Sequence, residues 1–69
     1  MTYYTLIIRR SAGAAFEIDF GDYDRESVND EMRGYIESGE HKPADLKIVR
    51  SKDDQASIET AVAAYNRKV

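Results

Sequence analysis

The residues best suited to chemistry lie in the stretch FGDYDRES, residues 20–27, where three acidic side chains surround Gly21 and Tyr23. Alternating carboxylates can hold a hard cation such as Ca²⁺. Neither the glycine nor the flanking helix fits the pattern of a calcium loop, so no metal site is predicted. The same residues suit a turn from strand to helix, with Asp24 as the helix cap and Tyr23 packed on the first turn. We favour the turn.

Other arrangements that support catalysis are missing from the sequence. His41 is the one histidine, and it stands in a charged loop without a nucleophile or carboxylate at a suggestive spacing. Gly13 and Gly21 belong to no phosphate-binding loop pattern. We therefore expect a non-enzymatic protein with no catalytic residue and no cofactor.

Charge is concentrated in one part of the chain. Residues 17–40 contain nine acids and two arginines, whereas the whole chain has a net charge of −3. Such a surface repels phosphate backbones and attracts basic proteins. The sequence predicts a protein partner, such as a nucleic-acid-handling complex with a basic groove, and no direct contact with nucleic acid. The predicted partner-binding residues are Asp22, Tyr23, Asp24, Glu26, Asp30 and Glu37.

The elements that position these residues form a single domain, residues 1–69, without a linker or a cysteine. Residues 3–10 are rich in aromatic and β-branched types, which is typical of a strand. A hairpin at residues 11–14 leads to a second strand, residues 15–20. There the alternation predicts that Phe16, Ile18 and Phe20 share the buried face.

Helical spacing follows, from a cap at Asp24 to a stop at Gly39. A loop, residues 39–45, and a short strand, residues 46–50, come next. The last element is a helix opened by Ser51 with Asp54, or by Asp53. Its apolar stripe is Ile58, Ala61, Val62, Tyr65 and Val69.

The order ββαβα predicts an α+β fold. A hairpin followed by a crossover favours a three-stranded antiparallel sheet in the order 2-1-3. Both helices are expected on one face, as a two-layer sandwich. The other face would then expose Tyr3, Ile7 and Val49, so the alternative function is a self-associating module that forms a homodimer there. A weaker third hypothesis is a nucleic-acid binder that uses Arg9, Arg10, Lys47, Arg50 and Lys52.

No stretch of the sequence reaches the roughly 20 apolar residues that span a membrane. In MTYYTLIIRR the positive charges follow the apolar part, the reverse of a secretory signal. We expect a cytoplasmic protein that does not bind membranes.

The succession YTLIIRR, FEIDFGDYDRESV, DLKIVRSKD and AYNRKV resembles the layout of short accessory proteins of phages and prophages. The resemblance extends over the whole chain and concerns size, charge and element order. Such proteins include inhibitors of host defence, anti-CRISPR proteins among them. The resemblance implies a phage or mobile-element protein that inhibits or modulates a host protein complex in the host cytoplasm.

Overall fold

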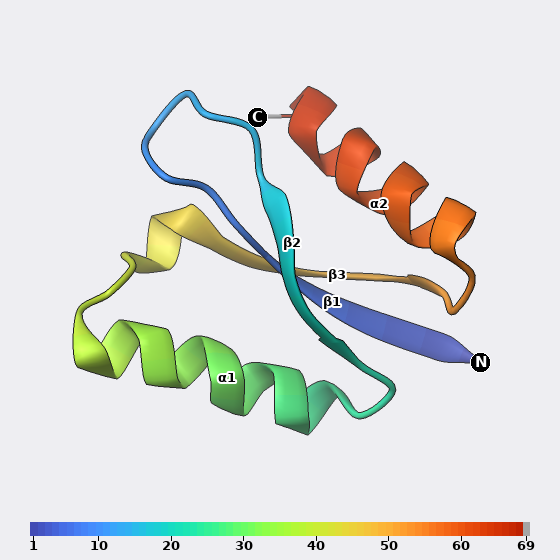
Figure 1. The fold of residues 1–69 in the computed structure, drawn as a ribbon, viewed down its shortest axis with the longest axis horizontal. Helices are drawn as coiled ribbons and strands as arrows, with labels where there is room; N and C mark the ends of the chain where they lie inside the picture. The colour runs from blue at the N-terminus through green and yellow to red at the C-terminus, as the bar shows by residue number, and fades with distance from the viewer. Residues whose placement is uncertain (69) are drawn as a thin grey trace.

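The computed structural model describes residues 1–68, which fold into three strands, two α-helices and one short 3₁₀-helix. The elements are β1 (Thr2–Ile8), β2 (Glu17–Asp22), α1 (Arg25–Ser38), η1 (Pro43–Asp45), β3 (Leu46–Lys52) and α2 (Gln55–Lys68) (Figure 1). The predicted order ββαβα is confirmed.

The sheet has β1 at its centre, with β2 and β3 antiparallel on either side. Leu6 lies opposite Phe20 of β2 and Ile48 of β3, so three apolar side chains form a row across the sheet. A central strand is covered on both faces, which explains why β1 is apolar in both registers. The predicted strand order 2-1-3 is confirmed.

A bulge in β2 changes which residues face inward. Leu6 pairs with Phe20, whereas the next residue, Ile7, pairs with Ile18, so β2 has one extra residue between them. Phe20 consequently packs beside Leu6, while Phe16 packs beside Ile7 on the other face. The prediction that Phe16, Ile18 and Phe20 share one buried face is wrong. Ile18 remains 48% exposed.

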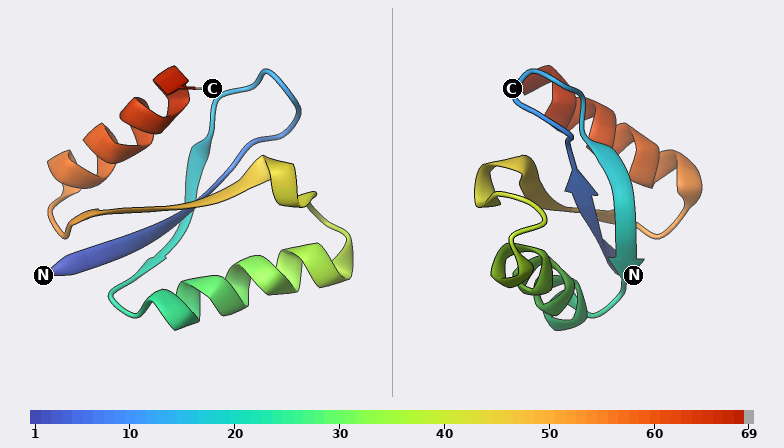
Figure 2. Two further views of the ribbon diagram at one scale, coloured as in Figure 1. Left: turned by 180° about the vertical axis from the view of Figure 1, so that it is seen from behind. Right: turned by 60° about the vertical axis from the view of Figure 1, so that its left-hand side comes forward.

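The two helices cover opposite faces of the sheet (Figure 2). On one face, Val28 of α1 packs in a cluster with Leu6 and Leu46. On the other face, Val62 of α2 packs in a separate cluster that contains Ile7. The predicted two-layer sandwich with both helices on one face is therefore wrong, because the layers are helix, sheet and helix.

This arrangement removes the predicted dimer interface. Tyr3, Ile7 and Val49 point to the face that α2 covers, where Ile7 is 0% exposed and the other two are partly buried. The prediction that these residues form an open apolar face is wrong. Ile7 can contact a second copy of the chain only if α2 leaves the sheet.

The first helix begins and ends where the sequence predicts. The Asp24 carboxylate accepts hydrogen bonds from the Glu26 amide at 3.1 Å and the Ser27 hydroxyl at 3.2 Å. Gly39 ends the helix with a φ of 78°, and its amide donates to the carbonyl of Ile36 at 3.2 Å. A positive φ of this kind suits glycine because it has no side chain.

The second helix is capped by Asp54. Its carboxylate accepts hydrogen bonds from the Ser57 amide at 2.9 Å and the Ser57 hydroxyl at 2.8 Å. These bonds lower the pKa of Asp54, with the side-chain bond from Ser57 as the main cause. The predicted caps, Ser51 or Asp53, are wrong, because Ser51 belongs to β3 and Asp53 precedes the residue that caps the helix. Val69, in the predicted stripe, lies outside the described residues.

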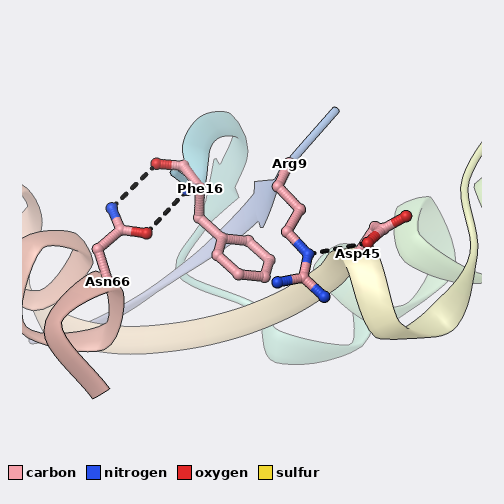
Figure 3. A network of polar contacts seen from close by, with 4 residues as sticks. All are labelled: Arg9, Phe16, Asp45 and Asn66. Atoms are coloured by element: carbon pink, nitrogen blue, oxygen red, sulfur yellow. Dashed lines mark hydrogen bonds and ion pairs between the residues drawn. The ribbon is translucent and has the colours of Figure 1, made fainter. Parts of the chain in front are cut away.

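Polar contacts join the hairpin to η1 and to the end of α2 (Figure 3). The Asn66 side chain accepts a hydrogen bond from the Phe16 amide at 2.8 Å and donates to the Phe16 carbonyl at 3.2 Å. Arg9 donates to the Asp45 carboxylate at 2.8 Å, and its guanidinium lies 5.1 Å from the centre of the Phe16 ring. The Asn66 contacts tie the end of α2 to the start of β2, and the Arg9 contacts tie the hairpin to η1.

Thr5 is a polar residue in the apolar core beneath α2. Only 1% of it is exposed, and its hydroxyl has no hydrogen-bond partner among residues 1–68. Thr5→Val removes this unpaired hydroxyl while keeping the branched shape, so we expect a gain of about 1 kcal/mol in unfolding free energy. Chemical denaturation of both proteins tests this. A less stable Thr5→Val protein would mean that the hydroxyl does have a partner.

Candidate functional site

The turn between β2 and α1 uses two of the predicted partner-binding acids for its own structure. Asp22 accepts a hydrogen bond from the Asp24 amide at 2.9 Å, and Asp24 caps the helix. Both are satisfied by short local hydrogen bonds. Their charge remains at the surface, but their positions are explained by the turn.

Tyr23 is an exposed aromatic residue that is nevertheless held in place. It is 51% exposed, and its ring lies edge-on to the Tyr3 ring with 5.0 Å between the centres. Its hydroxyl donates to the Asp53 carboxylate at 3.2 Å, and this hydrogen bond raises the pKa of Tyr23. Two segments distant in sequence therefore fix one surface side chain.

The position of Tyr3 depends on Gly21. A Cβ atom built on Gly21 would lie 2.5 Å from the Tyr3 hydroxyl oxygen, closer than real Cβ contacts come. The missing side chain lets Tyr3 lie across β2 and support Tyr23. Gly21 thus serves close packing, in addition to the bend expected from the sequence.

The outer side of α1 carries the other predicted acids in one stripe. Glu26, Asp30 and Glu37 are exposed and recur at the spacing of one helical face. Asp30 accepts a hydrogen bond from Arg33 at 3.0 Å. Among residues 1–68, Glu26 and Glu37 have no basic side chain within ion-pair distance. We call Glu26, Asp30 and Glu37 the acidic stripe; Tyr23 precedes its first residue by less than one turn.

The flank of α1 beside β2 is also acidic, and the sequence did not indicate the contact that forms there. Tyr35 donates a hydrogen bond to the Asp19 carboxylate at 2.9 Å and packs edge-on to His41, with ring centres 4.9 Å apart. The hydrogen bond to Asp19 is the main cause that raises the pKa of Tyr35; Glu31 and Glu40 add to the rise. Nothing in the local sequence pairs Tyr35 of α1 with Asp19 of the bulged strand β2.

This pairing predicts a change in alkaline titration. Because the folded protein holds the Tyr35 phenol protonated, its pKa exceeds the unfolded value of 10.0. The stabilisation is complete below pH 10 and is lost as the pH rises through the folded pKa. Asp19→Asn should lower the midpoint of phenolate absorbance assigned to Tyr35, with Tyr35→Phe as the assignment control. Identical midpoints in the Asp19→Asn and unmodified proteins would contradict the contact.

The residues of the weaker nucleic-acid hypothesis do not form one free surface. Arg9 is paired with Asp45, and the Lys47 amine lies 5.8 Å from the centre of the Tyr65 ring. Arg50 and Lys52 lie at the far end of β3. Within residues 1–68, no three metal-ligating side chains come together, and no helix has the length and apolar character to cross a membrane.

Comparison with models of protein families, with curated proteins and with solved structures finds no match. The function must therefore be inferred from the residues of this chain.

Proposed function

We propose that this chain is a non-enzymatic binding protein that docks on a basic surface of another protein through the acidic stripe and Tyr23. The observation that carries the proposal is the state of Tyr23. It is half exposed, yet fixed by Tyr3 and Asp53. An aromatic ring that is ordered before binding loses little entropy when it is buried by a partner.

The acidic stripe supplies attraction and orientation to this contact. Within the part of the chain that the structure describes, residues 1–68, Glu26 and Glu37 form no ion pair, so their charge is available to a basic partner. Surface charges of this kind mainly raise the association rate and select the partner, whereas buried aromatic residues supply most of the affinity. Tyr23 and the stripe therefore have complementary roles.

The resemblance to phage accessory proteins suggests the kind of partner. A nucleic-acid-handling complex of the host presents basic grooves, and a protein seated in such a groove would inhibit it without any catalytic step. The proposed role is that of an inhibitor or modulator encoded by a phage or mobile element.

A pull-down from nuclease-treated host lysate tests the proposal, with tagged unmodified protein beside Asp30→Lys/Glu37→Lys. Nuclease removes prey that is bridged by nucleic acid. We expect a prey protein that the unmodified chain retains and the double variant loses. Equal retention by both, or no specific prey, would contradict the proposal.

Single reversals provide the matched control. Glu37→Lys and Glu59→Lys make the same charge change at exposed helical positions, but Glu59 belongs to α2. Glu37→Lys should weaken prey retention and Glu59→Lys should not. Equal weakening would mean that net charge matters and the acidic stripe does not.

A further inference from the structure

A small pocket lies at the junction of the sheet with the beginning of α1. Its volume is about 160 Å³, and it is lined by Tyr4, Arg25, Ile48 and Arg50. Tyr4 and Arg50 are register partners on β1 and β3, and Arg25 is the first residue of α1. Three elements therefore bring two guanidinium groups, one aromatic ring and one aliphatic side chain to the same hollow.

The two arginines of this pocket differ from Arg9 and Arg33 because they lack a carboxylate partner among residues 1–68. Arg9 and Arg33 each have a carboxylate partner at 2.8 Å and 3.0 Å. Arg25 and Arg50 have none within 4.0 Å among residues 1–68. Two positive groups that share a pocket repel one another, and a bound anion would remove that repulsion.

Asp22 and Asp24, which precede α1, form no ion pair with Arg25 or Arg50 among residues 1–68. Asp22 lies across Tyr4 on β2, and its carboxylate accepts the hydrogen bond from the Asp24 amide. Asp24 is occupied by the helix cap. Asp22 and Asp24 thus have hydrogen-bond partners of their own, whereas Glu26, which follows Arg25, has no basic partner within ion-pair distance among residues 1–68.

We propose that this pocket binds a phosphate group. A phosphate dianion matches two guanidinium charges, and the planar fork of arginine suits bidentate contact with phosphate oxygens. Tyr4 brings a hydroxyl donor to the lining, and the beginning of α1 adds the positive end of the helix dipole. Ile48 gives one apolar wall.

An adjoining hollow indicates where the rest of a phosphate ester would lie. It shares Arg50 with the pocket and is otherwise lined by Met1, Thr2, Ser51 and Lys52. A phosphate monoester can extend into it, whereas free phosphate uses only the pocket between Arg25 and Arg50. The site shares no residue with the acidic stripe, although Arg25 precedes Glu26 in the chain, and it does not depend on the proposed docking function.

Titration of ¹⁵N-labelled protein with inorganic phosphate tests the proposal, followed through the side-chain Nε–Hε signals of the arginines. We expect saturable shifts at Arg25 and Arg50. Each of Arg25→Gln and Arg50→Gln should weaken binding about tenfold or more, as loss of a charge-assisted hydrogen-bonding group does. Arg67→Gln makes the same charge change at the end of α2 and should leave the affinity unchanged.

Each variant should give the same amide spectrum as the unmodified protein, apart from signals near the substitution. This agreement shows that the fold is kept. A second titration with phenyl phosphate shows whether the natural ligand is a phosphate ester or free phosphate. If phenyl phosphate binds more tightly than inorganic phosphate, the site is assigned to an ester. If the two bind equally, the site is assigned to free phosphate. Shifts that grow without saturation, or that are as large in Arg25→Gln as in the unmodified protein, would overturn the proposal.

Discussion

Replacing Ile7 by glutamate is expected to unfold the protein. Ile7 is 0% exposed and packs with Phe16 and Val62 between the sheet and α2. A carboxylate there has no basic partner, and an unpaired buried charge costs about 3–5 kcal/mol or more. A domain of this size has a total stability of roughly 5 kcal/mol. Circular dichroism should show loss of the cooperative thermal transition.

Ile18→Glu is the matched control for this prediction. Ile18 is the cross-strand partner of Ile7 on the same face of the sheet, but it is 48% exposed. The same substitution there should leave a folded protein whose stability changes by less than about 1 kcal/mol. If Ile7→Glu also folded, α2 would not cover this face, and a self-associating surface would again be available.

Truncation of Tyr23 is expected to have the largest effect on partner binding. Aromatic residues at the centre of an interface contribute about 2 kcal/mol or more, so Tyr23→Ala should weaken binding by about 30-fold. Calorimetry with the purified partner would measure the loss. The fold should survive, because half of the side chain is already exposed.

Tyr23→Phe separates the ring from its hydroxyl. The phenylalanine keeps the edge-on contact with Tyr3 and loses the hydrogen bond to Asp53. An exposed hydrogen bond contributes little, so binding should fall by less than about fivefold. Full affinity in Tyr23→Ala would show that this residue is no anchor.

Local signals in the sequence predicted much of the fold. The cap at Asp24 and the stop at Gly39 depend on hydrogen bonds between neighbouring residues, and the structure has both. The strand order followed from connection rules and from the apolar character of β1 on both faces. These features require no knowledge of contacts between distant segments.

Errors arose where the outcome depends on distant packing. The bulge between Ile18 and Phe20 leaves no mark in the alternation, so the inward faces were assigned wrongly. The two residues between β3 and α2 permit the helix to lie on either face, and only the need to cover Ile7 and Val49 selects one.

Part of the candidate site was beyond sequence reasoning for the same reason. Tyr23 was identified as a residue of the turn, but its supports, Tyr3 and Asp53, are 20 and 30 residues away in the chain. The pocket of Arg25 and Arg50 also joins distant residues. Charge counting located the acidic segment, and the structure distinguishes acids occupied by the turn from those in the acidic stripe.

The central claim is that a partner docks on the acidic stripe and Tyr23. The most direct measurement is the amide spectrum of ¹⁵N-labelled protein with and without the protein recovered by the pull-down. We predict that signals of Tyr23, Glu26, Asp30 and Glu37 shift or broaden, while those of the exposed side of α2 stay unchanged. Changes confined to α2 or β3, with α1 unaffected, would contradict the account.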